Sequence, residues 1–590
     1  MEKHIFWSGT QERGLEEKIL ADYSEEAVRK HLEYLTAFAR RAGTKDELKA
    51  ANYIKSRLDE SGVETEIHEF DAYISLPGEA ALEVLSPIRR SFACLPGVFI
   101  TPTPPEGLKA ELVCLEGEGE RKKEIPDIEN KVVLISGTKE SRRKTIRLAQ
   151  AKKAIAQVLV TPGKTGAISI YQPRSVWGSP TPETLHDILK APALSISNED
   201  GNYLKQLTQK GPVVVRLKAE AWCGYKKVRL PVGHIRGMSN PDQYVLVGGH
   251  YCSWFTSATD NAVSNALMLE MARIFSKYKK RLKRGVRFCW WTGHEQGTFA
   301  GSTWYADHFW DDIRDHSIAY LAMDGLGRKG SAGFEAKNTK EIRKFQERVI
   351  KEVLGLKIKS GNISKGGDQS FLGIGIPSFV GKTGFDQAPQ GDEDPVWYSH
   401  TAEDTLDKVD VKLIEIPFKV HAVSILRLCN SPVLPFEFVS QVKELKEELK
   451  SLKVRGPSLL GLNSLIIRAK EVEKKTKALD AMIVKTLSTL DKKSPPKERN
   501  PQFEKINTCL MELSRILLPA FSTKAGKYGQ DPVGTKINTI PTFQPLEKLN
   551  KSKDSPEAYQ ALLTSLLRER NKLSDGLNSA NHLLEDTVGI

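Results

Sequence analysis

The stretch VLVGGHYCSWFTSATDNAVSNALMLEMARIF, residues 245–275, decides the fold class of the chain. It opens with an apolar run that ends at His250, and Asp260 then precedes a helical pattern. A short buried strand followed by an amphipathic helix is the repeating unit of an α/β fold. Because ligands of open α/β sheets bind at the carboxyl ends of the strands, His250 is a candidate functional residue.

Three further apolar runs alternate with helical stretches: VRFCWWTG at 286–293, IAYLAMDG at 318–325 and IPSFVG at 376–381. Near-continuous apolar strands separated by helices indicate a mostly parallel sheet that is covered on both faces. We therefore expect residues 229–433 to form most of an α/β core with such a sheet.

The chain changes character on either side of this core. Residues 79–228 hold strand-like pieces broken by Pro and Gly and one helical run, which indicates a compact β-rich module inserted into another domain. Residues 1–78 then form the N-terminal part of that domain, with a helical pattern over 25–62 and Thr44 as a candidate N-cap. Residues 434–590 are charged and helical in pattern, and we expect a helical terminal domain there.

Composition excludes several classes of protein. The 590 residues are 40% hydrophobic, which is typical of a soluble chain with several domains. The net charge of +13 is spread over short basic runs without interleaved aromatics, so we expect no nucleic-acid partner, and no apolar stretch is long enough to predict a membrane span. Seven cysteines without disulfide spacing, and a start without a signal pattern, predict a cytoplasmic protein.

Five side chains of the core are types that bind metal, and they follow strand-like runs or lie in loops: His250, Asp260, Glu295, Asp324 and His400. Taken singly, a strand-end aspartate is often a turn or cap residue, and a lone histidine is more often structural than a ligand. Together, two histidines and three carboxylates suit one or two divalent ions of the zinc type. A carboxylate such as Asp260 can bridge two metals about 3.5–4 Å apart.

The order of these residues resembles the co-catalytic zinc aminopeptidase and glutamate carboxypeptidase family, and the likeness extends over most of the chain. Residues 40–66, RRAGTKDELKAANYIKSRLDESGVETE, look like that family's N-terminal helix segment. The module at 79–228 resembles a protease-associated domain, and residues 434–590 resemble the helical dimerisation domain of glutamate carboxypeptidase and the transferrin receptor. The resemblance implies a zinc-peptidase core with a mostly parallel sheet, an inserted protease-associated domain, and a homodimer paired through the helical domain.

The resemblance also implies a role for each candidate ligand. His250 and Asp324 would hold one zinc ion, Glu295 and His400 would hold the other, and Asp260 would bridge them. The implied function is a zinc-dependent hydrolase that cleaves an amide bond in a small peptide or an acyl-amino acid. Whether it would act as an aminopeptidase or a carboxypeptidase stays open.

Two positions depart from the family's pattern. His294 stands where the family has a general-base glutamate, and Cys252 stands where it has the aspartate that orients the first imidazole. Both changes remove a negative charge. His294 can replace the base in principle, because histidine is the commonest general base.

Three hypotheses follow from these departures. The chain is a working hydrolase with His294 as its base, a non-catalytic metal-binding or scaffold homologue, or an enzyme that uses Cys252 and His294 as a nucleophilic pair. A glycine-rich run at 365–377, KGGDQSFLGIGIP, is a candidate lining of the substrate pocket and has no phosphate-binding pattern.

Overall fold

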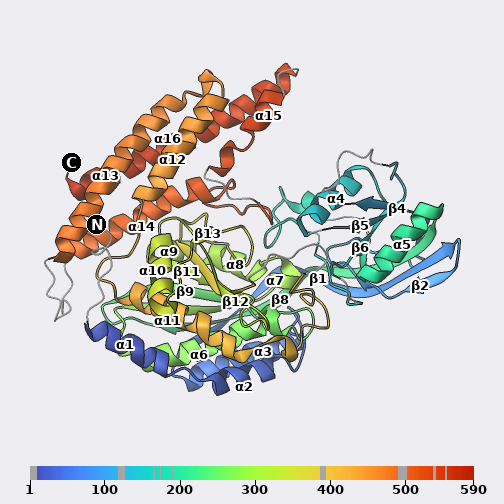
Figure 1. The fold of residues 1–590 in the computed structure, drawn as a ribbon, viewed down its shortest axis with the longest axis horizontal. Coiled ribbons are helices and arrows are strands. Elements are labelled where there is room, and N and C mark those ends of the chain that lie inside the picture. Colours follow the sequence, from blue (N-terminus) through green and yellow to red (C-terminus); the bar gives the residue numbers. More distant parts are fainter. Residues whose placement is uncertain are drawn as a thin grey trace.

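The computed structural model describes residues 10–116, 126–137, 139–163, 166–172, 174–188, 191–385, 394–488, 501–535, 540–551 and 555–589. The chain forms three lobes, which are an α/β core, an inserted lobe and a helical lobe (Figure 1). Within the described ranges, none of the helices combines the length and the apolar character needed to cross a bilayer.

A mixed and mostly parallel sheet forms the core. Its central strands are β10 (Arg284–Trp291), β9 (Asn240–His250), β11 (Ser317–Ala322) and β14 (Ser378–Gly384). These four strands are neighbours in that order and run parallel. At the margins, β8 (Val214–Ile235) pairs antiparallel with β10, and β12 (Ala332–Asn338) pairs antiparallel with β14. The predicted sheet is confirmed, and each predicted apolar run overlaps one of its strands.

Helices cover both faces of this sheet. One face carries α2 (Glu25–Leu35), α3 (Lys45–Glu60), α6 (Val263–Lys277) and α11 (Glu415–Asn430), and the other carries α8 (Ala300–His308) and α9 (Trp310–His316) (Figure 1). Alternate residues of β9 point to opposite faces of the sheet. Val245 and Val247 pack on the side of α6, and Leu246 packs on the side of α8. The predicted N-cap is also present, because the Thr44 hydroxyl accepts a hydrogen bond from the amide of Glu47.

The inserted lobe is joined to the core by a long antiparallel ribbon. β1 (Glu64–Ser86) and β8 pair along most of their length, with an irregularity between Pro77 and Ala80. The lobe adds β2 (Arg90–Phe92), β3 (Leu95–Pro96), β4 (Leu108–Glu116), β5 (Val132–Ser136), α4 (Lys139–Ala151), β6 (Ala156–Val160), β7 (Ala193–Ile196) and α5 (Asn198–Lys210). It has its own buried core. The pattern predicts one helix here, whereas the structure has both α4 and α5.

The helical lobe consists of α12 (Val439–Arg455), α13 (Leu462–Ser488), α14 (Pro501–Ser522), α15 (Leu546–Lys551) and α16 (Pro556–Val588). The prediction that this region is helical is confirmed. The buried guanidinium of Arg515 on α14 fixes the lobe to the core. It donates to the carbonyl oxygens of Arg314 (2.8 Å), Gly375 (2.9 Å) and Ser317 (2.5 Å).

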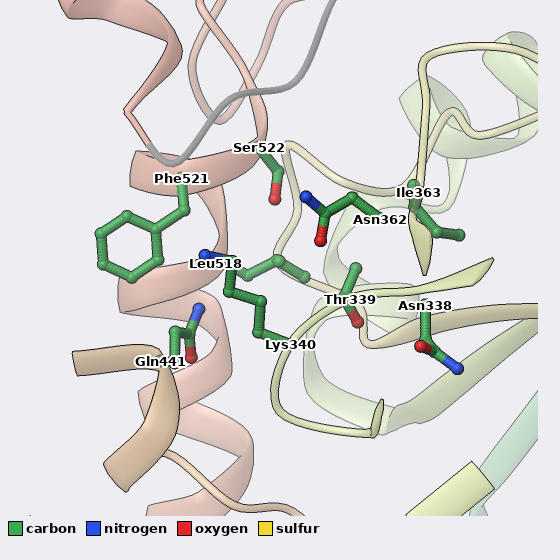
Figure 2. A pocket seen from close by; sticks show the side chains of 9 residues that line it. All are labelled: Asn338, Thr339, Lys340, Asn362, Ile363, Gln441, Leu518, Phe521 and Ser522. Carbon is green, nitrogen blue, oxygen red and sulfur yellow. The ribbon is translucent and has the colours of Figure 1, made fainter. Parts of the chain in front are cut away.

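A small pocket lies where the helical lobe meets the edge of the sheet (Figure 2). Asn338, Lys340 and Asn362 line it from the core side, and Gln441 of α12 and Leu518 of α14 line it from the helical side. Its volume of about 30 Å³ suits one or two water molecules and is too small for a peptide. None of the five candidate ligands lines this pocket. We therefore regard it as a gap in the packing between the core and the helical lobe.

Candidate metal centre

The five candidate ligands meet at the carboxyl ends of the parallel strands. His250 ends β9, Glu295 lies in α7 (His294–Gly297) just after β10, and Asp324 follows β11. Asp260 lies ahead of α6, and His400 lies in the loop after β14. Because parallel strands end at the same edge of a sheet, residues separated by up to 150 positions converge on one place.

The ligand atoms form two groups that share Asp260. One group is His250, Asp260 and Asp324, the other is Asp260, Glu295 and His400, and within each the atoms lie within 4.8 Å of one another. Asp260 Oδ1 is 3.1 Å from His250 Nε2, and its Oδ2 is 3.3 Å from His400 Nε2. Asp260 therefore turns one oxygen toward each group, in the arrangement that the family resemblance implies.

The remaining distances complete the two groups. Asp324 Oδ1 lies 3.9 Å from His250 Nε2, and Glu295 Oε1 lies 3.4 Å from His400 Nε2. The side chain of His250 is fully buried, whereas that of Asp324 is 37% exposed. The centre is therefore accessible from the Asp324 side.

The charges of this cluster depend on one another. Burial by itself would lower the pKa of His250, but its hydrogen bond to Asp260 and the nearby carboxylates raise that pKa well above the usual value. Burial would raise the pKa of Asp260, yet the bonds and charges of His250 and His400 hold it well below the usual value. The carboxylates therefore stabilise positive charge in a buried site. A divalent ion can replace the protons on the imidazoles, since metal ligands bind in their deprotonated form. The nitrogen and oxygen donors fit zinc.

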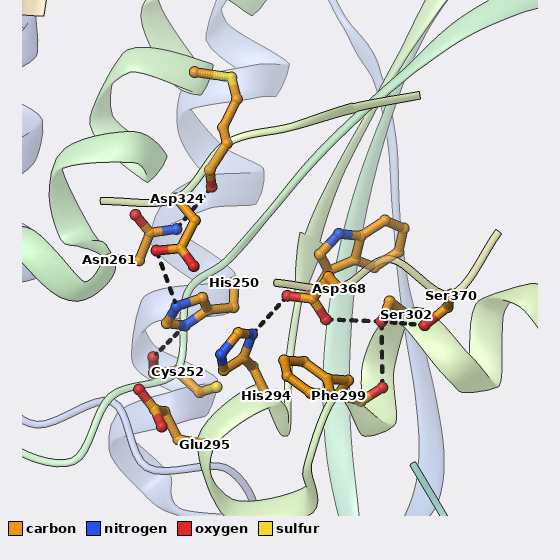
Figure 3. Close-up of polar contacts among 12 residues, drawn as sticks. His250, Cys252, Asn261, His294, Glu295, Phe299, Ser302, Asp324, Asp368 and Ser370 are labelled. Carbon is orange, nitrogen blue, oxygen red and sulfur yellow. Dashed lines mark hydrogen bonds and ion pairs between the residues drawn. The ribbon is translucent and has the colours of Figure 1, made fainter. Parts of the chain in front are cut away.

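The main chain of Cys252 orients His250. His250 Nδ1 donates to the carbonyl oxygen of Cys252 at 3.0 Å, which leaves Nε2 facing the carboxylates (Figure 3). The Cys252 thiol is fully buried, and this burial raises its pKa. A neutral buried thiol is a poor nucleophile, which weighs against the nucleophilic pair. The resemblance implies an aspartate side chain as the acceptor for this imidazole, whereas here a peptide carbonyl accepts its hydrogen bond.

His294 lies directly beside the cluster. Its ring stacks on that of His250 with the centroids 3.8 Å apart. A nitrogen of this ring forms a third group with a ring nitrogen of His250 and a carboxylate oxygen of Glu295. Its Nδ1 is 2.7 Å from Oδ2 of Asp368, a residue of the glycine-rich run (Figure 3). Nothing in the sequence around Asp368 marks it as a functional residue.

Asp404 is a second acidic residue that the sequence analysis missed. Its Oδ1 accepts the amide of Thr259 at 2.9 Å, and its Oδ2 accepts the amide of Asp260 at 3.1 Å. Burial raises the pKa of Asp404 to about 6. Asp404 thereby fixes the main chain at Asp260, whose side chain is the carboxylate shared by the two groups. Asp404 lies in the stretch SHTAEDT, residues 399–405, and its position there gives no hint of this contact.

The other two lobes reach the centre as well. Gln172 of the inserted lobe donates to the carbonyl oxygen of Glu295 at 2.7 Å. The main-chain amide of Ile170, in the same lobe, donates to the carbonyl oxygen of His400 at 3.0 Å. Gln530 of the helical lobe donates to a carbonyl oxygen of the glycine-rich run at 3.0 Å. The surroundings of the centre therefore depend on all three lobes.

The chain is similar to known proteins in sequence and in fold. Residues 232–422 match the model of Peptidase family M28. All five candidate ligands lie inside the matched segment. The chain is 28% identical over 305 residues to the probable glutamate carboxypeptidase VP8 of Zea mays, across 46% of this chain and 41% of that protein. It is 26% identical over 355 residues to carboxypeptidase Q of Xenopus laevis, across 56% and 70% of the two chains.

Solved structures give the same picture of the fold. The zinc aminopeptidase BSAP of Bacillus subtilis matches 68% of this chain and 94% of its own, with a TM-score of 0.55 and 20% identity. The resemblance found in the sequence is thereby confirmed, and so is the core with its mostly parallel sheet. The match to the Zea mays relative spans less than half of that protein's length.

Proposed function

We propose that the chain is a zinc-dependent hydrolase of the peptidase and amidohydrolase type, which cleaves an amide bond in a small peptide or an acyl-amino acid. The observation that carries the proposal is the position of Asp260, whose two oxygens face the histidines of two adjoining groups. The match of residues 232–422 to Peptidase family M28 supports it.

His250 and Asp324 would hold one ion, Glu295 and His400 a second, and Asp260 would lie between them. Bound zinc supplies Lewis-acid chemistry, in which a scissile carbonyl is polarised and a water becomes more acidic.

His294 is the residue that we assign to proton transfer. Its Nδ1 is occupied by Asp368, so the opposite nitrogen, Nε2, is the one that accepts a proton from the attacking water. The same nitrogen then delivers that proton to the leaving amine, which completes hydrolysis without net change in the protein. The ring is 13% exposed and stacks on His250, which keeps it beside the cluster.

A substrate screen tests the proposal. Aminoacyl amides, dipeptides and acyl-amino acids are incubated with protein purified without chelator, and each set is repeated after chelation and after zinc is added back. We expect turnover of at least one class that chelation abolishes and zinc restores. Substrates of the same library whose amino or carboxyl terminus is blocked show whether the protein acts as an aminopeptidase or as a carboxypeptidase. A library with no turnover in the zinc-loaded protein would favour the non-catalytic homologue.

We also propose the domain limits 1–78 with 229–433, 79–228 and 434–590 for the core, a protease-associated domain and the helical domain. The separate hydrophobic core of the inserted lobe supports the limits 79–228.

A cytoplasmic location is supported by the seven cysteines, which carry no disulfide.

A homodimer through residues 434–590 belongs to the proposal. Among the described residues of this region, the large hydrophobic side chains that are exposed include Val454 (87%), Tyr528 (79%), Leu459 (69%) and Ile467 (57%). These side chains are available for contact with a second copy, and two-fold dimers are the commonest soluble oligomers. Light scattering at micromolar concentration should give twice the chain mass of 65.8 kDa. A mass of one chain would contradict this assembly.

A further inference from the structure

We infer that Asp368 is a positioning residue for His294 and that it carries the negative charge which position 294 itself lacks. The inference rests on the proposed hydrolase and adds a residue to its machinery. The base would then be an imidazole and carboxylate acting together, in place of a single carboxylate.

The contact between the two residues fixes the tautomer of the imidazole. A carboxylate oxygen accepts, so at 2.7 Å the Nδ1 of His294 must be the donor to Asp368 Oδ2. The proton of the neutral ring therefore lies on Nδ1, and Nε2 presents its lone pair. When Nε2 takes up a proton, the ring becomes a cation that the adjoining carboxylate stabilises.

The carboxylate of Asp368 is itself held in place. Asp368 is 2% exposed, and a buried carboxylate needs donors to offset its lost hydration. Ser302 Oγ donates to Asp368 Oδ1 at 2.7 Å and lies 2.8 Å from Ser370 Oγ (Figure 3). The indole of Trp177, from the inserted lobe, donates to Ser370 Oγ at 2.9 Å. A polar chain thus runs from the inserted lobe to the base.

The imidazole of His294 is also confined on its faces and edges. It stacks on His250 on one side, and Phe299 meets it edge-on with the centroids 4.5 Å apart. Asp368 has a φ of 59°, a left-handed conformation that aspartate and asparagine tolerate better than most residues. Asp368→Asn therefore keeps the shape of the site, while it removes the charge and replaces one acceptor oxygen by a donor nitrogen.

The test compares Asp368→Asn with the wild type by the tautomer of His294 and by turnover. In the variant, the Ser302 hydroxyl should keep its donation to the acceptor at 2.7 Å in preference to the Phe299 carbonyl oxygen at 3.3 Å. The amide oxygen then takes the place of Oδ1, and the amide nitrogen faces Nδ1. That nitrogen donates, and the proton of the ring should move to Nε2. Nitrogen NMR of protein with labelled histidine reads this directly, and the His294 signal among the twelve histidines is the one lost in His294→Ala.

For turnover we expect Asp368→Asn to lower kcat by about 10²–10⁴-fold, with little change in KM or zinc content. Ser302→Ala is the matched control, because it keeps the carboxylate and removes one hydrogen bond, and it should cost about tenfold or less. The double variant His294→Ala/Asp368→Asn should be no slower than His294→Ala alone, since the two residues act as a unit.

A second comparison separates charge from structure. In His294→Glu the new carboxylate would face Asp368 at close range. Because the two charges repel, the turnover of this variant should stay low. His294→Glu/Asp368→Asn removes that repulsion and should be faster than either single variant.

An unchanged tautomer in Asp368→Asn, or wild-type turnover in that variant, would overturn the inference. If the wild type cleaves no substrate, the proposed function fails, and the NMR comparison still decides the role of Asp368.

Discussion

Replacing His294 with alanine is expected to lower kcat by about 10²–10⁴-fold while the zinc content stays at the wild-type level. The change removes the nitrogen that accepts the proton and leaves the side chains of all five candidate ligands in place. Steady-state kinetics on a substrate found in the screen gives kcat, and elemental analysis of the same preparation gives the zinc content.

His308→Ala is the matched control for this variant. His308 is an exposed histidine of α8 whose Nδ1 bonds the carbonyl oxygen of Trp304 in its own helix. It should have wild-type turnover. Unchanged turnover in His294→Ala would contradict the base role, and loss of zinc in that variant would make His294 a ligand instead. If Cys252→Ser lost turnover while His294 was dispensable, the thiol would be the reactive group.

Replacing Asp260 with asparagine should have the largest effect of all on metal binding. The amide keeps the size of the side chain but removes the charge that both histidines face, at 3.1 Å and 3.3 Å. Loss of an outer partner of a ligand costs about 10–100-fold in affinity or activity, and loss of a shared ligand should cost more. We expect turnover to fall to background, with less than one zinc ion retained per chain.

Asp242→Asn is the control for this substitution. Asp242 is exposed at the other end of β9, so the same chemical change is made on the same strand, away from the centre. Its zinc content and turnover should equal those of the wild type. Equal zinc content in Asp260→Asn and Asp242→Asn would contradict the shared role of Asp260.

The core was predictable because its signals are local and strong. A strand buried on both faces must be apolar at nearly every position, as residues 244–249 of β9 and 318–322 of β11 are, and this pattern is visible without a structure. The helix α2 shows its buried stripe in the spacing of Val28, Leu32 and Leu35. The ends of these strands then place candidate ligands at one edge of the sheet.

The inserted lobe shows how a local signal in the sequence can differ from the strand pairing. Pro77 and Gly78 lie just before the proposed limit at 79, and such residues are typical of the end of a strand. In the structure the pairing of β1 with β8 continues at Ala80 after an irregularity. A ribbon stabilised by pairing between distant strands can pass through residues that would interrupt an isolated strand.

The parts of the site that escaped prediction depend on contacts between distant segments. Asp368 and His294 are 74 positions apart, and only the path of the glycine-rich run brings them together. The acceptor for His250 is a main-chain carbonyl, a group that every residue has, so no letter of the sequence marks it. The change to cysteine at 252 suggests a lost acceptor, although the main chain supplies one.

The shared metal centre is tested by the zinc content of wild-type protein purified without chelator, measured beside that of Asp260→Asn. We predict one to two zinc ions per wild-type chain and a clear loss in the variant. A wild-type protein that binds no zinc, even after zinc is added and the excess removed, would contradict it.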